Sequence, residues 1–221
     1  MSKILSKNSL QFGDIILCYE NEKFDALGKV IQRVTKSEYV HAGIYLGYNI
    51  VAESMTSGLA KESLDNVLQR YSHVAIFRRH DAWDDGRIFL LNYFVDKMLQ
   101  AGCKYNLLGV LKFKLAKEEH QQTLTQILDD YFSGNYAQIS PIKNRYFCSE
   151  FVVDCFVVTG FIEPSTAVLY NSTVTAPGDL GRDPTFGYFL GYLSSDPQYE
   201  IPEDDEFYNA SKWEDIFGSE I

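Results

Sequence analysis

A helix expected over Cys148 to Thr159 carries the residues whose types suggest chemistry. One face of it holds residues spaced by three and four positions: Cys148, Phe151, Val152, Cys155, Phe156 and Thr159. Cys148 should therefore point inward from the first turn, where unpaired N–H groups and the positive end of the helix dipole favour an anion. That position favours a nucleophilic thiolate, and the same N–H groups could receive the oxyanion of an attacked carbonyl.

The alternative for any core-facing cysteine is simple packing, because free cysteine is among the most buried residue types. Cys155 has apolar neighbours and lies away from a helix end, so we assign it to packing, together with Cys18 and Cys103. The four cysteines lack the paired short spacings of a zinc site and are too few for a disulfide scaffold. We expect reduced thiols and neither a metal nor an organic cofactor.

A nucleophilic thiol needs a base and an orienting group. Of the four histidines, only His41 stands at the head of a strand beside an expected hairpin. If Gly47 to Asn49 form the loop, Gly43 pairs with Glu53, and Glu53 lies diagonal to His41 on the same face. A one-residue change in the turn would move Glu53 to the other face. His73, His80 and His120 are assigned to the surface, His73 because no acidic partner is nearby.

The elements that must position these residues follow from periodicity and turn signals. Strands are expected at Gly13–Glu20, on both sides of Gly47–Asn49, at His73–Arg79 and within the stretch that follows Thr175. Helices are expected at Phe24–Val34, Ser63–Tyr71, Asp84–Gly102, Lys117–Phe132 and Cys148–Thr159. Residues 104–115 are ambiguous between helix and strand. A largely antiparallel sheet with helices to one side is an α+β fold.

Composition and charge limit the partners. The 221 residues are 46% hydrophobic and carry a formal net charge of −10. Residues 196–221 hold nine acids against Lys212 alone, so 9 − 1 = 8 of the excess negative charges lie there. We therefore expect no nucleic-acid partner. Residues 1–11 lack a secretory apolar run, and no stretch approaches a membrane span, so we expect a cytoplasmic protein without stable membrane insertion, with signal-free secretion left open.

Five short motifs in a fixed order resemble a known family. They are "FGDIIL", "VHAGIYLG", "VAES", "YFCSEFVVDCF" and "APGDL". In this order they look like the circularly permuted NlpC-type branch of the papain-like cysteine hydrolases, the YiiX-like group. The resemblance implies a permuted papain-like domain over residues 1–195, with residues 105–145 as an inserted helical segment or lid and residues 196–221 as an acidic tail.

The same resemblance implies roles for individual residues. Cys148 matches the family's nucleophile, His41 its base and Glu53 its polar third member. The segment "KYN", which contains Tyr105, is similar to a family segment that is expected to form part of the substrate cleft. We place Ser149, beside the cysteine, with the substrate or oxyanion residues. Tyr19 is a candidate to supply a hydroxyl to the oxyanion site, with packing as the alternative.

Three functions stay open at this point. The first is a thiol hydrolase of amide bonds, in a peptide or an N-acyl amine. The second is an acyltransferase or thioesterase acting on lipid acyl groups, because "FCSEFVVDCF" is also similar to a segment of lecithin:retinol acyltransferase relatives; an apolar cleft under Leu107–Phe113 would favour it. The third is a binding protein on the same scaffold. The tail either is solvated or docks on the body or on a basic partner through its aromatic residues.

Overall fold

Six strands form one sheet in the order β4-β3-β2-β1-β5-β8, and every neighbouring pair runs antiparallel. This computed structural model describes residues 4–20, 26–35, 37–81, 83–135, 140–163, 166 and 170–210. The strands are β1 Ile15–Tyr19, β2 Tyr39–Tyr45, β3 Ile50–Met55, β4 Gly58–Ser63, β5 His73–Arg78 and β8 Tyr188–Leu193. With helices on the sheet, the fold is α+β, as the sequence predicts.

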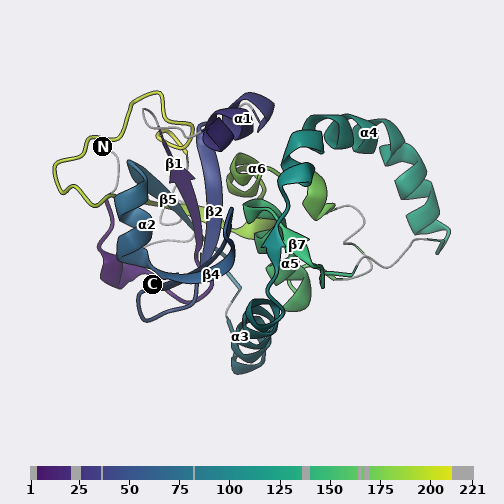
Figure 1. The fold of residues 1–221 in the computed structure, drawn as a ribbon, viewed down its shortest axis with the longest axis horizontal. Coiled ribbons are helices and arrows are strands. Elements are labelled where there is room, and N and C mark those ends of the chain that lie inside the picture. The colour runs from purple at the N-terminus through teal and green to yellow at the C-terminus, as the bar shows by residue number, and fades with distance from the viewer. Residues whose placement is uncertain are drawn as a thin grey trace.

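Helices cover both faces of the sheet (Figure 1). They are α1 Ala26–Thr35, α2 Leu64–Arg70, α3 Asp85–Gln100, α4 Leu107–Phe132, α5 Cys148–Val158 and α6 Pro177–Arg182. Two short strands, β6 Lys104–Tyr105 and β7 Arg145–Tyr146, pair in parallel, and single 3-10 turns occupy Lys7–Ser9, Ser172–Val174 and Pro184–Phe186.

Successive side chains of a strand point to opposite faces of the sheet, so buried core residues lie on both faces. Ile16 of β1 packs on one face with Leu64 and Val67 of α2. Leu17, its neighbour in sequence, packs on the other face with Phe151 of α5. The expectation of helices to one side of the sheet is therefore wrong, because α2 and α5 pack on opposite faces. The helix that carries Cys148 is therefore buried directly against the sheet, and this packing fixes where its first turn lies.

The β2–β3 hairpin has the expected loop and register. Gly47, Tyr48 and Asn49 all have positive φ, at 80°, 49° and 63°. The Leu46 N–H donates to the Ile50 carbonyl at 2.8 Å, and Gly43 pairs with Glu53. The diagonal placement of Glu53 beside His41 is therefore confirmed.

The expected helices form, with shifted ends. Ser63 and Asp84 are the N-caps of α2 and α3, each accepting a backbone N–H through its side chain. The ambiguous stretch resolves into β6 and a single long helix, α4, that starts ten residues before the expected Lys117 because Asn106 caps it. Strand β4 and helix α6 were not expected. The first two residues of the expected Phe24–Val34 helix lie outside the described part of the chain.

The surface placement of His73 is wrong. Its side chain is fully buried, and its Nε2 lies 3.1 Å from Oδ2 of Asp205. Asp205 also accepts hydrogen bonds from the hydroxyls of Tyr39 at 2.9 Å and Tyr192 at 2.6 Å. The acid that pairs with His73 comes from the end of the chain, where proximity in sequence cannot reveal it. Within the expected acidic tail, Phe207 is buried in the main core as well.

Each edge of the sheet makes a backbone hydrogen bond to a non-strand segment. At the β8 edge the Leu5 N–H donates to the Tyr192 carbonyl at 2.8 Å. At the β4 edge the Leu59 N–H donates to the Cys103 carbonyl at 3.2 Å. Among the helices in the described ranges, none has both the length and the apolar character to cross a bilayer.

Candidate active site

Cys148 is the first residue of α5, and Phe147 is the N-cap with an extended backbone. The Phe147 N–H donates to Oε2 of Glu150 at 3.1 Å, so the acidic residue of the first turn closes the helix start. The Cys148 side chain is buried, and Cys148 belongs to the cluster that includes Phe151 and Val152, on the expected inward face.

His41 lies between this thiol and a carboxylate. Its Nε2 is 2.7 Å from Oε2 of Glu53, which is fully buried. The Cys148 side chain lies near enough to the ring to raise the pKa of His41. The three residues singled out in the sequence are thus brought together, in the order thiol, imidazole and carboxylate.

The neighbours of His41 favour its charged form. Burial lowers the pKa of the ring, but the interactions with Cys148 and Glu53 outweigh this effect and raise the pKa to about 9. Burial would raise the pKa of Glu53, but His41 and Arg70 lower it below its ordinary value. At neutral pH the pair is therefore an imidazolium and a carboxylate.

Two residues at the end of α2 complete the surroundings of the imidazole. Arg70 Nη2 donates to Oε1 of Glu53, so both carboxylate oxygens are engaged. The ring of Tyr71 stacks on that of His41, with centroids 5.7 Å apart and planes at 11°. Sequence reasoning missed both residues, since nothing in the helical pattern of residues 63–71 relates them to His41 across the sheet.

A small hollow of about 20 Å³, partly open to solvent, lies beside Cys148. Helix α1 and the start of α4 form two of its sides. Its lining is mostly apolar and consists of Ile31, Val34, Thr35, Tyr105, Val110, Phe113, Phe147, Cys148, Ser149, Ala176 and Pro177. A small apolar group could therefore lie next to the thiol.

The structure places the remaining candidates differently. Tyr105 and Ser149 both line the hollow, although the Ser149 hydroxyl donates to the Thr175 carbonyl at 2.7 Å. Tyr19 is not among the lining residues. Its ring stacks on His73 with centroids 4.2 Å apart, and its hydroxyl is hydrogen-bonded to Glu38.

A network of polar side chains contacts acidic residues in the first two turns of α5. Asn106 accepts from the Gly109 N–H at 3.0 Å, as the cap of α4, and donates from Nδ2 to Oε2 of Glu150 at 3.2 Å. Lys143 Nζ lies 3.0 Å from Oε1 of Glu150 and 2.6 Å from Oδ2 of Asp154. The side-chain amide of Asn106 therefore links the first turn of α4 to the first turn of α5.

The fold and site together define an α+β protein in which a cysteine at a helix start meets a histidine and a glutamate from a hairpin. No family model matches the chain. The chain is similar to the probable lipoprotein peptidase YaeF of Escherichia coli K12, with 29% identity over 160 residues. The match covers 68% of this chain and 56% of the relative, so the chain spans little more than half of that protein.

Proposed function

We propose that the chain is a cysteine hydrolase of amide bonds in peptide or N-acyl substrates. The observation that carries the proposal is that Cys148, at the start of a buried helix, lies near enough to His41 to raise its pKa, while the same ring is hydrogen-bonded to Glu53. The similarity to a protein named as a probable peptidase supports the same reaction class.

The proposed reaction runs through a thioester. The Cys148 sulfur attacks the carbonyl carbon, and the first N–H groups of α5 receive the negative charge that develops on the oxygen. The imidazolium of His41 gives its proton to the leaving nitrogen as the C–N bond breaks. A water molecule, deprotonated by His41, then attacks the thioester carbon, which releases the acid and restores the thiol. Glu53 keeps the ring oriented and stabilises its charged form.

A second candidate uses the same thioester but lipid acyl groups, by acyl transfer or by hydrolysis of an ester or thioester. The apolar lining of the hollow favours it, because Val110 and Phe113 of α4 contribute that lining, directly beside Cys148. In this case the first carbons of the acyl chain would lie in the hollow, and an amine, alcohol or water would accept the acyl group.

The first experiment measures nucleophilicity. The alkylation rates of all four cysteines are followed against pH by peptide mass spectrometry, in the parent protein and in His41→Ala. Cys155 is also buried and serves as the internal reference. We expect Cys148 to react much faster than Cys155 below pH 8, with a pH profile that His41→Ala abolishes. If the two cysteines react equally slowly when folded but equally fast in urea, the chain is a binding protein rather than a hydrolase.

A second experiment separates the substrate classes. Activated amides and esters of increasing acyl length are compared in the parent and in Val34→Phe, which narrows the hollow from α1 at a half-buried position. A lipid substrate predicts that long chains react best in the parent and lose most in the variant. A peptide substrate predicts no gain with acyl length and a similar loss for all probes.

A further inference from the structure

The first three turns of α4 expose a row of leucines. Leu108, Leu111 and Leu115 are 63%, 58% and 69% exposed, and Leu107 is 49% exposed. At about 100° per residue these four side chains cover an arc of roughly 100°. The arc lies on the side of the helix away from Val110 and Phe113, which are buried against the body.

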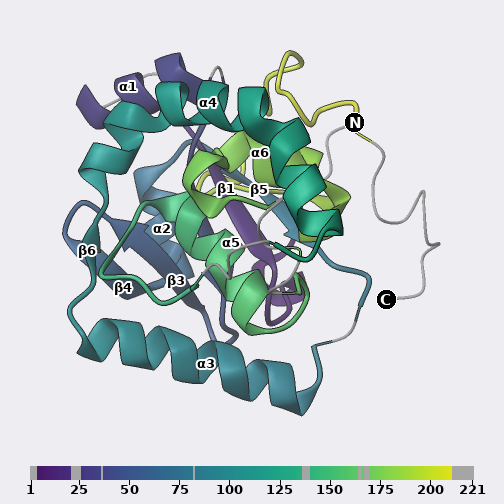
Figure 2. The ribbon, with the colours of Figure 1, turned by 90° about the vertical axis from the view of Figure 1, so that its right-hand side faces the viewer.

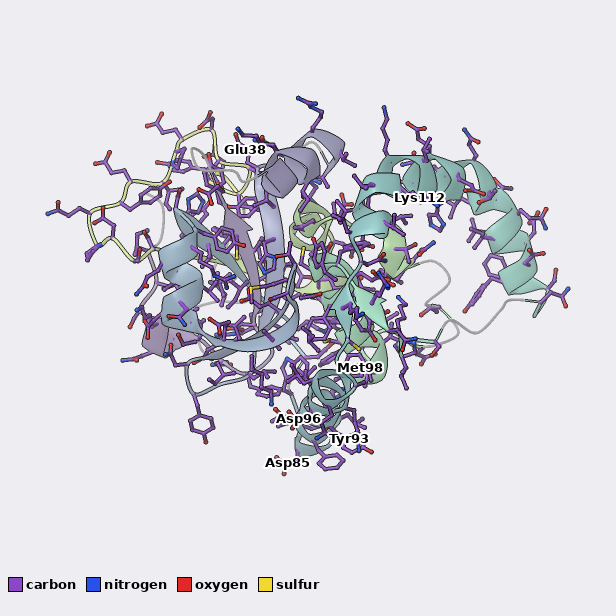
Figure 3. All side chains as sticks on the ribbon, in the orientation of Figure 1. Glu38, Asp85, Tyr93, Asp96, Met98 and Lys112 are labelled. Atoms are coloured by element: carbon purple, nitrogen blue, oxygen red, sulfur yellow. The ribbon has the colours of Figure 1, made fainter. Side chains whose placement is uncertain are left out.

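Lysines border this arc on both sides. By the same helical spacing, Lys112 falls about 40° beyond Leu108, and Lys114 about 20° beyond Leu107 on the opposite side. Both lysines are exposed, and Lys112 lies on α4 in Figure 3. A lysine beside an apolar surface can lay its alkyl stem along that surface and extend its ammonium group past the edge.

The charge of this region is opposite to that of the whole chain. Helix α1 and residues 107–117 together carry five basic residues and no acidic one, whereas the chain has a formal net charge of −10. Helix α1 and the start of α4 lie side by side (Figure 2) and both line the hollow beside Cys148. The basic side chains there are Lys29, Arg33, Lys112, Lys114 and Lys117. Two of them have acidic partners from outside these segments: Lys117 pairs with Asp179 at 2.6 Å, and Lys114 lies 3.9 Å from Glu118.

We propose that this face, Leu107 to Leu115 of α4 with its bordering lysines, docks on the surface of an anionic phospholipid bilayer. An apolar arc bordered by lysines is the pattern of a helix that lies in the membrane interface, with leucines among the acyl chains and ammonium groups at the phosphates. A second copy of the chain fits this face less well, because symmetric pairing would bring the same lysines together. The proposal does not depend on catalysis by Cys148.

Vesicle co-sedimentation tests the proposal with the full chain. The vesicles are phosphatidylcholine alone and phosphatidylcholine mixed with phosphatidylglycerol. The variants are Leu108→Ser with Leu111→Ser and Leu115→Ser, and separately Lys112→Gln with Lys114→Gln. The matched control is Phe89→Ser with Tyr93→Ser on α3. Those two rings are 65% and 54% exposed, and α3 lies at the far side of the molecule from α4 (Figures 2 and 3).

We expect the parent to bind the anionic vesicles, to bind neutral vesicles more weakly, and to be released by salt. Losing two lysines should weaken binding by at least about tenfold, at roughly 1 kcal/mol per charge. The leucine variant should weaken it further, and the α3 control and Cys148→Ala should bind like the parent. All variants should keep the thermal midpoint of the parent, because the altered side chains are exposed.

Three results would overturn the docking surface. The first is parent binding that the leucine variant leaves unchanged. The second is no parent binding to anionic vesicles. The third is a dimer in sedimentation velocity that the leucine variant converts to monomer, which would show that a second copy covers the face. Since Cys148→Ala is included, loss of the proposed chemistry and loss of docking are separate readouts.

Discussion

His41 and Glu53 face each other across the β2–β3 hairpin, with Nε2 and Oε2 2.7 Å apart. The other oxygen of Glu53 accepts from Arg70, so one buried carboxylate stabilises two cations from different elements. Together with Cys148, this carboxylate raises the pKa of the buried imidazole, so Glu53 is one of the two residues on which the charge of His41 depends.

Glu53→Gln should lower the pKa of His41, because the ring loses its anionic partner while its burial stays. If the proposed hydrolysis occurs, its rate should fall by a factor on the order of 10⁴, the loss seen when a comparable orienting carboxylate becomes an amide. The pKa is followed by NMR of the ring protons. Glu119→Gln, the same change at an exposed position of α4, should alter neither quantity. An unchanged His41 pKa in Glu53→Gln would contradict the assignment.

Protonation of His41 should contribute to the pH dependence of the free energy of unfolding. Its pKa rises from 6.5 to about 9 on folding, so its protonation stabilises the fold fully below pH 6.5, and this contribution is lost as pH rises toward 9. The shift corresponds to roughly 3 kcal/mol at 1.36 kcal/mol per unit. Urea unfolding of the parent and of His41→Gln between pH 6 and pH 9.5 measures it. The difference in the free energy of unfolding between the two proteins should become smaller as pH rises. A difference that does not change with pH would contradict the prediction.

Asn106 links the starts of α4 and α5, so the effect of replacing it on stability should depend on the charge of the new side chain. Asn106→Ser keeps a cap for α4 but loses the bond to Glu150. Asn106→Asp also keeps the cap, but sets a second carboxylate against Glu150. We expect Asn106→Asp to be less stable than Asn106→Ser by about 1 kcal/mol or more at pH 7, since a like charge near a buried carboxylate is unfavourable. Equal unfolding midpoints in urea would show that the link does not form in solution.

Asp205 should be the residue through which the C-terminal segment contributes most to stability. Asp205→Ala leaves the hydroxyls of Tyr39 and Tyr192 and the Phe207 N–H without their acceptor in a buried site. At about 1–3 kcal/mol for each unsatisfied group, the free energy of unfolding should fall by at least 3 kcal/mol. Asp204→Ala, one residue earlier and exposed, should cost less than about 0.5 kcal/mol. Similar losses in both variants would contradict the anchoring role.

The sequence allows the centre of the site to be predicted because it depends on local geometry. The hairpin loop sets the register that places Glu53 beside His41, and the helical period sets the direction of Cys148. Both follow from rules that act over a few residues. The packing of α5 on the sheet then brings the two parts together.

The parts that escaped prediction depend on contacts between distant segments. The pairing of His73 with Asp205 spans 132 positions. Helix α6 contains two glycines and is short. It is supported by Pro177 in its first turn and by the Ala176 N–H, which donates to Asp179. Arg70 and Tyr71 reach the site only because α2 packs on the face of the sheet where His41 and Glu53 point. None of these leaves a periodic pattern.

The backbone bonds of Leu5 and Cys103 at the two ends of the sheet have a consequence for how the protein behaves at high concentration. An unprotected edge strand is a template on which other chains can add strands and start to aggregate. Here Leu5 already uses an acceptor of β8, and Cys103 already uses a donor of β4. The molecule can therefore display an apolar helical surface in water while its sheet offers fewer backbone groups for the growth of intermolecular β-structure.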